Sequence, residues 1–356
     1  MAARPEVHPL RIAAIDPLTD DAVALTLDVP EELRERYAFR PGQHLTLVGE
    51  DGVRRSYSLC VAPSTGVWRI GVKQLPGGAF SEGVLPGLKV GDALQVMTPS
   101  GSFGPAPDPN RARRYVGIAA GSGITPVLSI AGAVLETEPR SHVTLVVANR
   151  THRSVMFLDE IAALKDAFPD RVQVLHVLSR EQQDVELLSG RLDAERLRRL
   201  MPLIGDAGEV DDWFLCGPQE MVLALRDELV ALGATSVHTE LFHAEPVARP
   251  ARARTEALEG DPEGAATVRL RLEGRTTELA LPPDGPPVLE AALAVRSDLP
   301  FACKGGVCGT CRALLVEGSV EMDANWALEP EEVEAGYVLT CQSHPTSARV
   351  ELDYDA

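Results

Sequence analysis

The chain has 356 residues, a length that predicts two or three domains with separate cores. Its formal net charge of −18 disfavours nucleic acids and anionic membrane surfaces as partners. The charge favours a solubilising role, with docking to a basic partner as the alternative.

The N-terminal part of the chain predicts a β-rich domain, which we assign to residues 1–108. Short runs that alternate apolar and polar residues are separated by Gly and Pro turns. These runs cover residues 22–29, 44–50, 54–62, 68–75 and 88–101. Many short strands with frequent turns predict an antiparallel β-barrel or sandwich, and we expect the barrel.

The pattern of predicted elements changes in residues 109–245, where strands alternate with helices. Strand-like runs lie at 114–120, 142–149, 171–179, 212–217 and 236–242. Helical periodicity marks 125–136, 154–168, 193–204 and 219–233. This alternation predicts an α/β domain with a doubly wound parallel sheet. The uncharged segment Tyr115–Leu135 contains several glycines, so we interpret it as strand, loop and helix instead of a membrane span.

Residues 246–265 are rich in Pro, Ala, Arg, Glu and Gly without a period, and they predict a flexible linker. The third domain is expected at 266–356. It begins with two alternating strands that are joined by a turn at Glu273–Gly274. A helix at 287–295 and a cysteine-rich loop follow.

The cysteine-rich loop has the spacing C-x4-C-x2-C, and a fourth cysteine comes after 29 further residues. The four candidate metal ligands are Cys303, Cys308, Cys311 and Cys341. This spacing is typical of plant-type [2Fe–2S] sites, in which four thiolates hold two irons. Structural zinc is the alternative, although zinc sites usually offer two paired Cys or His units and only one such pair is present.

Glycines between these cysteines allow tight turns and bring backbone N–H groups toward the sulfurs. Residues 266–356 resemble the plant-type ferredoxin domain. The resemblance implies an α+β, β-grasp fold and one-electron transfer. Since no apolar leader is visible and four of the six cysteines are clustered, we expect a reducing, cytoplasmic location.

Two motifs in the β-rich domain point to a flavin. The first, R-x-Y-S at residues 55–58, alone fits an ordinary strand; the second is "GVKQLPGGAFS", whose Gly and Ser residues suit a pyrophosphate. In this order they resemble the ferredoxin–NADP reductase superfamily. The resemblance implies that Arg55 pairs with the flavin phosphates, Tyr57 packs on the isoalloxazine and Ser58 lies near N5. The implied flavin-binding residues are Arg55, Ser56, Tyr57, Ser58, Val72, Lys73, Gly78 and Ser81. We favour FAD over FMN because related reductases use it, although the residues leave this open.

The nucleotide-binding motif is expected at "GIAAGSGITP", where Gly121-x-Gly123 lies between a strand and a helix. It continues into Thr125-Pro126 instead of a third glycine, so a plain tight turn is the alternative. This form also resembles the reductase superfamily, which implies that Thr125 contacts the nicotinamide end and that Pro126 belongs to the same binding motif.

A second superfamily match is Cys216-Gly217-Pro218 at the end of a strand, although a free cysteine is commonly just buried. The resemblance places Cys216 beside the nicotinamide C4, so Ser58 and Cys216 are the candidate catalytic residues. It also brings Phe242 to the flavin face, with Glu240 close by.

The choice of dinucleotide depends on the end of the second strand, "VVANRTHRS". An NAD site usually has Asp or Glu there, whereas this chain has Arg150, Arg153 and Ser154 and no acid before Asp159. Cationic donors suit a 2′-phosphate, so we favour NADPH over NADH. Solvated surface arginines are the alternative interpretation.

The domain order predicts an oxidoreductase that converts two-electron into one-electron transfer. With the segments "HPLRIAAIDPLTDDAVALTLDVP", "FRPGQHLTL", "RRSYSLC" and "NRTHRSVMF", the whole chain resembles the family of reductase subunits of phenylacetyl-coenzyme A epoxidase. This implies electron transfer from NADPH through FAD and a [2Fe–2S] cluster to a di-iron oxygenase of phenylacetate catabolism. The alternative is the reductase of a Rieske oxygenase such as 3-ketosteroid 9α-hydroxylase. A redox sensor that binds both cofactors without turnover is a further hypothesis, disfavoured by the dinucleotide motifs.

Overall fold

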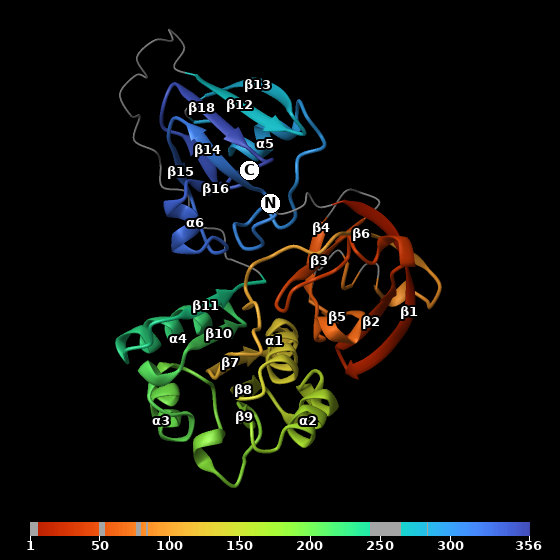
Figure 1. The fold of residues 1–356 in the computed structure, drawn as a ribbon, viewed down its shortest axis with the longest axis vertical. Coiled ribbons are helices and arrows are strands. Elements are labelled where there is room, and N and C mark those ends of the chain that lie inside the picture. The colour runs from red at the N-terminus through yellow and green to blue at the C-terminus, as the bar shows by residue number, and fades with distance from the viewer. Residues whose placement is uncertain (1–5, 50–53, 76–79, 83–84, 243–264, 283) are drawn as a thin grey trace. The chain divides into compact units, whose positions relative to one another are not determined.

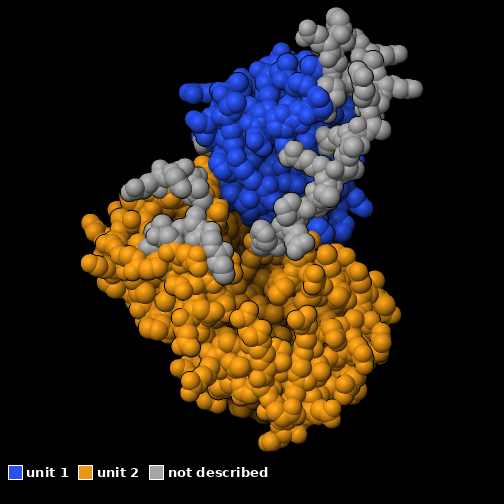
Figure 2. Space-filling view, turned by 180° about the vertical axis from the view of Figure 1, so that it is seen from behind, with its two compact units in different colours: residues 1–5, 243–356 blue, residues 6–242 orange. Residues whose placement is uncertain are grey.

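The computed structural model describes residues 6–49, 54–75, 80–82, 85–242, 265–282 and 284–356 (Figure 1). The chain forms two compact units, which Figure 2 colours separately. One unit is Glu6–Phe242, and the other is described from Ala265 to Ala356. Across the described ranges, every helix is too short or too polar to cross a membrane. The predicted linker at 246–265 lies outside the described residues except for its last residue.

The first part of the larger unit is a six-stranded antiparallel sheet in the order β4-β3-β6-β1-β2-β5. Its strands are β1 (Val7–Thr19), β2 (Ala22–Asp28), β3 (His44–Val48), β4 (Arg54–Ser58), β5 (Trp68–Lys73) and β6 (Ala93–Met97). Leu59, directly after β4, bridges Ile70 in β5, so the two edges of the sheet meet. The predicted antiparallel barrel is confirmed.

The long first strand is absent from the sequence prediction. Pro9 and Pro17 interrupt its alternation, because proline lacks the N–H that a sheet interior needs. The pairing of β1 with β2 shifts register between Ile12 and Ala14 and again between Pro17 and Thr19. These irregularities bend the strand, which then pairs with β6 as well as β2.

The second part of the larger unit has five parallel strands in the order β11-β10-β7-β8-β9, as predicted for a doubly wound fold. The strands are β7 (Arg114–Ala120), β8 (His142–Asn149), β9 (Val172–Leu178), β10 (Asp212–Cys216) and β11 (Val237–Glu240). The helices are α1 (Ile124–Thr137), α2 (Leu158–Ala167), α3 (Ala194–Ile204) and α4 (Gln219–Ala231). The strand order reverses between β7 and β10, which is where open α/β sheets bind ligands.

The second predicted helix begins later than its periodicity indicates. Residues 152–154 form a 3-10 turn, and Phe157 has a left-handed φ of 57° directly before α2. Phe157 is buried, and a Cβ on Gly71 of the barrel would lie 2.8 Å from its ring. The apolar residues before Leu158 therefore pack against the barrel instead of extending the helix.

The barrel and the parallel sheet share one interface. The Ser129 hydroxyl of α1 donates to the Val61 carbonyl at 2.7 Å, and Arg69 of β5 pairs with Glu160 of α2 at 2.6 Å. The apolar core around α1 includes barrel residues Ala22 and Ala24. These contacts position the barrel against the switch point of the sheet.

The C-terminal unit is built on a mixed five-stranded sheet in the order β13-β12-β18-β14-β16. Its strands are β12 (Ala266–Leu272), β13 (Arg275–Leu281), β14 (Arg312–Glu317), β16 (Tyr337–Leu339) and β18 (Arg349–Asp353), and β15 (Val320–Met322) pairs with β17 (Ser343–Pro345). The helices are α5 (Val288–Leu293) and α6 (Pro330–Glu334). Most of the later strands are three to six residues long, too short for an alternation signal.

The predicted turn between β12 and β13 is present. Glu273 and Gly274 both have positive φ, 55° and 66°, as in the type I′ turns that suit hairpins. This conformation is unusual for glutamate. The Asp355 carboxylate accepts the N–H groups of both residues at 2.7 and 2.9 Å, which stabilises the turn.

Candidate functional site

The two glycine motifs of the nucleotide-binding part meet at the switch point between β7 and β10. Gly121 has a left-handed φ of 57°, and a Cβ there would meet no atom of the described residues within 4 Å. A Cβ on Gly123 would lie 2.2 Å from the Cys216 carbonyl oxygen and 2.9 Å from the Gly217 nitrogen. Gly121 therefore faces open space at the turn, whereas Gly123 is required for the approach of the two motifs.

The two candidate catalytic residues converge through Glu240. The Ser58 hydroxyl donates to Glu240 Oε2 at 3.1 Å, a contact between positions 182 residues apart. Glu240 of β11 is in register with Cys216 of β10. Ser58 and Cys216 are both buried. The structure thus joins the end of a barrel strand to the ends of two strands of the parallel sheet.

Burial determines the protonation states of the Glu240 carboxyl and the Cys216 thiol. It raises the pKa of the Glu240 carboxyl to about 8, although the hydrogen bond from Ser58 acts in the opposite direction. Burial, and then the charge of Glu240, raise the pKa of the Cys216 thiol well above its usual range. At neutral pH the junction is therefore mainly uncharged, with a protonated carboxyl and a protonated thiol.

The structure describes four further residues that the resemblance to the reductase superfamily predicts for this site: Thr125, Pro126, Pro218 and Phe242. Thr125 is buried, and its hydroxyl donates to the Ser122 carbonyl at 3.0 Å. Pro126 lies in the first turn of α1, where a missing N–H costs nothing. Pro218 directly precedes α4. Phe242 is 41% exposed, two residues after Glu240.

The predicted flavin-binding motif forms β4. Arg55 is exposed, whereas Tyr57 is half-buried and its ring lies 5.6 Å from that of Phe80. The Ser56 hydroxyl is 3.0 Å from that of Thr46. A strand that carries an aromatic ring and an exposed cation and ends at the buried Ser58 suits an aromatic cofactor that carries phosphates.

The second flavin motif is described only in part. Val72 is buried in β5, and Lys73 pairs with Asp21 at 3.3 Å, so this ammonium already has a carboxylate partner. The buried Ser81 hydroxyl accepts the Leu75 N–H at 3.1 Å. Gly78 lies outside the described residues.

The predicted dinucleotide-specificity residues follow β8. Arg150 and Arg153 are exposed. The Ser154 hydroxyl is engaged locally, since it accepts the Thr151 N–H at 3.0 Å and donates to the Thr151 carbonyl at 2.7 Å. Glu181, which the sequence analysis missed, accepts the His152 N–H at 2.8 Å. An acid therefore lies beside the basic loop, brought there from the end of β9.

The four predicted metal ligands form two close pairs in the C-terminal unit, Cys303 with Cys308 and Cys311 with Cys341. Cys308, Cys311 and Cys341 are buried and Cys303 is half-buried. The Cys303 N–H lies 3.5 Å from the Cys308 sulfur, and the Gly305 N–H lies 3.3 Å from the Cys303 sulfur. The Cys308 thiol and then backbone N–H groups lower the pKa of Cys303 to about 6.

This donor set fits a [2Fe–2S] cluster. Four cysteine sulfurs surrounded by N–H donors are what the cluster requires. The buried Thr310 hydroxyl, between two of the cysteines in the sequence, acts on the Cys308 sulfur and favours its thiolate form, as a cluster ligand requires.

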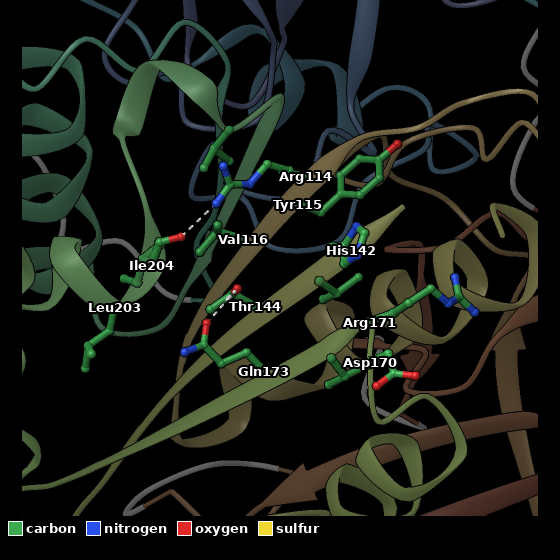
Figure 3. Close-up of a pocket in the computed structure, with 13 residues that line it drawn as sticks. Arg114, Tyr115, Val116, His142, Thr144, Asp170, Arg171, Gln173, Leu203 and Ile204 are labelled. Atoms are coloured by element: carbon green, nitrogen blue, oxygen red, sulfur yellow. Dashed lines mark hydrogen bonds between the residues drawn. The ribbon is translucent and has the colours of Figure 1, made fainter. Parts of the chain in front are cut away.

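A pocket of about 440 Å³ lies at the opposite end of the parallel sheet, at the amino ends of β7, β8 and β9 (Figure 3). Two hydrogen bonds join residues that line it. Thr144 donates to Gln173 at 3.3 Å, and Arg114 donates to the Ile204 carbonyl at 3.3 Å. None of the predicted site residues that the structure describes lines this pocket. It is therefore separate from the switch-point site.

Three family models match the chain. They describe an oxidoreductase FAD-binding domain at residues 9–104, an oxidoreductase NAD-binding domain at 118–227 and a 2Fe-2S iron-sulfur cluster binding domain at 270–346. The matches agree with the order of sites in the structure. The barrel, the parallel sheet and the C-terminal unit are thus FAD-binding, NAD-binding and 2Fe-2S-binding domains.

Curated relatives span the whole chain. A 1,2-phenylacetyl-CoA epoxidase subunit of Escherichia coli is 43% identical over 98% of both chains. The ferredoxin reductase component of 3-ketosteroid-9-alpha-monooxygenase from Rhodococcus rhodochrous is 34% identical over 97% of this chain and 96% of the relative. The structure of phthalate dioxygenase reductase shares the fold, with a TM-score of 0.58 at 24% identity over 98% of both chains.

These findings confirm the resemblance drawn from the sequence motifs. The chain belongs to the family of oxygenase reductases that combine FAD-binding, NAD-binding and 2Fe-2S cluster-binding domains in one polypeptide.

Proposed function

We propose that the chain passes electrons from NADPH through FAD and a [2Fe–2S] cluster to the di-iron phenylacetyl-CoA epoxidase. The observation that carries the first step is the junction of Ser58, Glu240 and Cys216, where barrel and nucleotide-binding strands meet. Flavin supplies the conversion between two-electron and one-electron transfer when it is bound, and the cluster accepts single electrons. The chain supplies binding, orientation and proton control.

In this proposal Tyr57 packs against the flavin ring, and Ser58 and Glu240 hold a proton beside it. The buried Ser58 hydroxyl binds Glu240 Oε2, and the raised pKa of Glu240 keeps its carboxyl protonated near neutral pH. The buried, neutral Cys216 thiol gives the nicotinamide a close-fitting surface without a charge. Cys303, Cys308, Cys311 and Cys341 hold the cluster.

For the other flavin positions, we propose that Arg55 pairs with the phosphates and that Ser56, Val72, Lys73, Gly78 and Ser81 hold the cofactor backbone. Phe242 covers the flavin, and six residues shape the nucleotide-binding turns. These six are Gly121, Gly123, Thr125, Pro126, Gly217 and Pro218. Gly121 supports this because its left-handed turn opens to free space. A bound anion at such a turn gains from the N–H groups at the start of α1.

NADPH is proposed because Arg150 and Arg153 are exposed after β8, where a 2′-phosphate would lie. Ser154 contributes less than the motif implies, since its hydroxyl already bonds to Thr151. Glu181 favours NADH as the second candidate, because a carboxylate accepts from a ribose 2′-hydroxyl and repels a phosphate.

The proposed acceptor rests on the 43% identity with the Escherichia coli epoxidase protein, compared with 34% for the ketosteroid monooxygenase reductase component. The alternative acceptor is accordingly the Rieske component of a 3-ketosteroid 9α-hydroxylase. A cytoplasmic location is part of the proposal, since free thiols and iron–sulfur sites suit a reducing compartment.

Reconstitution tests the acceptor. The holoprotein is mixed anaerobically with NADPH and either purified di-iron epoxidase subunits or a Rieske component, oxygen and the matching substrate are added, and product is measured. We expect product formation coupled to NADPH consumption only with the epoxidase subunits. Coupling only to the Rieske component would replace the proposed acceptor by the alternative. NADPH consumption without product in both mixtures would contradict both acceptors.

A further inference from the structure

Gln342 directly follows Cys341, and its side-chain amide connects the two segments that carry the cysteines. Its Nε2 lies 2.9 Å from the Lys304 carbonyl oxygen, 2.9 Å from the Cys341 carbonyl oxygen and 3.7 Å from the Cys341 sulfur. Carbonyl oxygens only accept hydrogen bonds, so the amide nitrogen must face them. One N–H serves Lys304, and the other is shared between the oxygen and the sulfur of Cys341.

The fold makes room for this side chain. Gly306 has a positive φ of 75°, and a Cβ there would lie 3.1 Å from Gln342 Cγ and 3.1 Å from the Ala324 carbonyl. Any larger residue at position 306 would press on the stem of Gln342. The glycine therefore serves the placement of Gln342 as well as the turn itself.

The Lys304 carbonyl belongs to a strained turn. Lys304 has a left-handed φ of 55°, a conformation that is unfavourable for a residue with a Cβ. The next residue, Gly305, directs its N–H at the Cys303 sulfur at 3.3 Å. By binding the Lys304 carbonyl, Gln342 stabilises the turn that aims this N–H at Cys303.

We propose that Gln342 is a positioning residue that raises the reduction potential of the cluster, an inference that rests on the proposed function of the four cysteines. Reduction adds negative charge to the cluster and its sulfurs, so an N–H donor stabilises the reduced state more than the oxidised state. Gln342 acts twice, directly on the Cys341 sulfur and through the Lys304 turn on the Cys303 sulfur.

A potential measurement on the full-length holoprotein tests this role. Gln342→Met keeps the length of the side chain and removes both N–H donors. In an anaerobic redox titration followed by EPR of the reduced cluster, we expect unchanged iron and sulfide content. The ratio of reduced to oxidised cluster at a fixed potential should fall about tenfold, which corresponds to about 59 mV for one electron. Gln182→Met, the same change at an exposed position of the other unit, should leave the ratio unchanged.

A fully loaded Gln342→Met protein with the wild-type ratio would overturn the proposal. If that variant loses its cluster, Gln342→Lys decides, because lysine retains N–H donors. Wild-type iron and sulfide contents in Gln342→Lys, with a reduction potential no lower than that of the wild-type cluster, would support a donor role. Loss of the cluster in both variants, or a lower potential with lysine, would assign Gln342 to packing alone. The proposed function fails separately, if the wild-type chain itself gives no EPR signal of a reduced cluster.

Discussion

The two units bring their reactive groups together in opposite ways. In the C-terminal unit, three of the four cysteines lie within nine residues on one loop, and one distant residue completes the set. In the larger unit, Ser58, Cys216 and Glu240 come from strands of two different sheets, and Ser58 binds a residue 182 positions away. A local site depends on turns, whereas a site made at an interface depends on the packing of whole domains. Substitutions in the two units should therefore impair the protein in different ways.

Cys308→Ser should have the largest effect and should be confined to the C-terminal unit. The buried Cys308 lies next to Cys303, and without its sulfur the proposed cluster lacks one of four ligands. We expect loss of inorganic sulfide, of the cluster EPR signal and of nearly all electron delivery to the oxygenase. NADPH should still bleach the flavin absorption at the wild-type rate.

Cys60→Ser is the matched control, since Cys60 is also buried but hydrogen-bonds to the Arg69 carbonyl in the barrel. It should retain sulfide and electron delivery. If Cys308→Ser kept full delivery to the oxygenase, the cluster would not lie on the electron path.

Gly123→Ala should have the largest effect on the packing of the larger unit. The new methyl group would lie 2.2 Å from the Cys216 carbonyl, so β10 must move away from the turn after β7. We expect overpacking to lower the free energy of unfolding by about 1–3 kcal/mol, seen by denaturant titration. The KM for NADPH should rise by at least tenfold while the cluster stays intact. Gly87→Ala, where a Cβ meets nothing within 4 Å, should change neither quantity.

Removing the Ser58–Glu240 contact should slow flavin reduction without loss of flavin. We expect Ser58→Ala and Glu240→Gln each to lower the rate by roughly 10²-fold in stopped-flow measurements, as is usual for a proton-handling group. Ser102→Ala and Glu195→Gln, at exposed positions, serve as controls. Wild-type rates in Ser58→Ala would show that this hydroxyl has no part in the step.

The pH dependence follows from the raised pKa of Glu240. Its carboxyl has a pKa of about 8 in the folded protein compared with 4.5 as the ordinary value. Its contribution to stability is therefore complete below pH 4.5 and is lost as the pH rises through about 8. Flavin reduction should fall above about pH 8 in the wild type. In Glu240→Gln both the rate and the melting temperature should lose this dependence, and a persisting slope would assign it to another group.

Arg150→Ala should have the smallest effect, limited to the choice of nucleotide. Removal of an exposed cation beside the proposed 2′-phosphate should raise the KM for NADPH about tenfold and leave the KM for NADH unchanged. Arg199→Ala, at an exposed position of α3, should alter neither. Equal changes for both nucleotides would favour the NADH alternative, in which Glu181 contacts the ribose.

The same contrast explains what could be predicted from the sequence. The cysteine spacing carries its own chemistry, and strand–helix alternation predicted the parallel sheet, because both signals are local. The Ser58–Glu240 contact and the approach of Gly123 to Cys216 needed the fold, since no spacing rule relates residues so far apart. The start of α2 was mistaken for the same reason, because Phe157 packs against Gly71 of a distant strand. No sequence motif indicated Gln342, because its proposed role depends on a turn at Lys304.

The central claim is that one chain carries electrons from the nucleotide through the flavin to the cluster. An anaerobic titration of the holoprotein with NADPH, followed by flavin absorption and cluster EPR, tests it most directly. Two electrons for the flavin and one for the cluster predict complete reduction at about one and a half NADPH molecules per chain, with the cluster signal rising along with flavin bleaching. Complete flavin bleaching at one NADPH per chain, with a cluster that stays oxidised on further addition, would contradict the account.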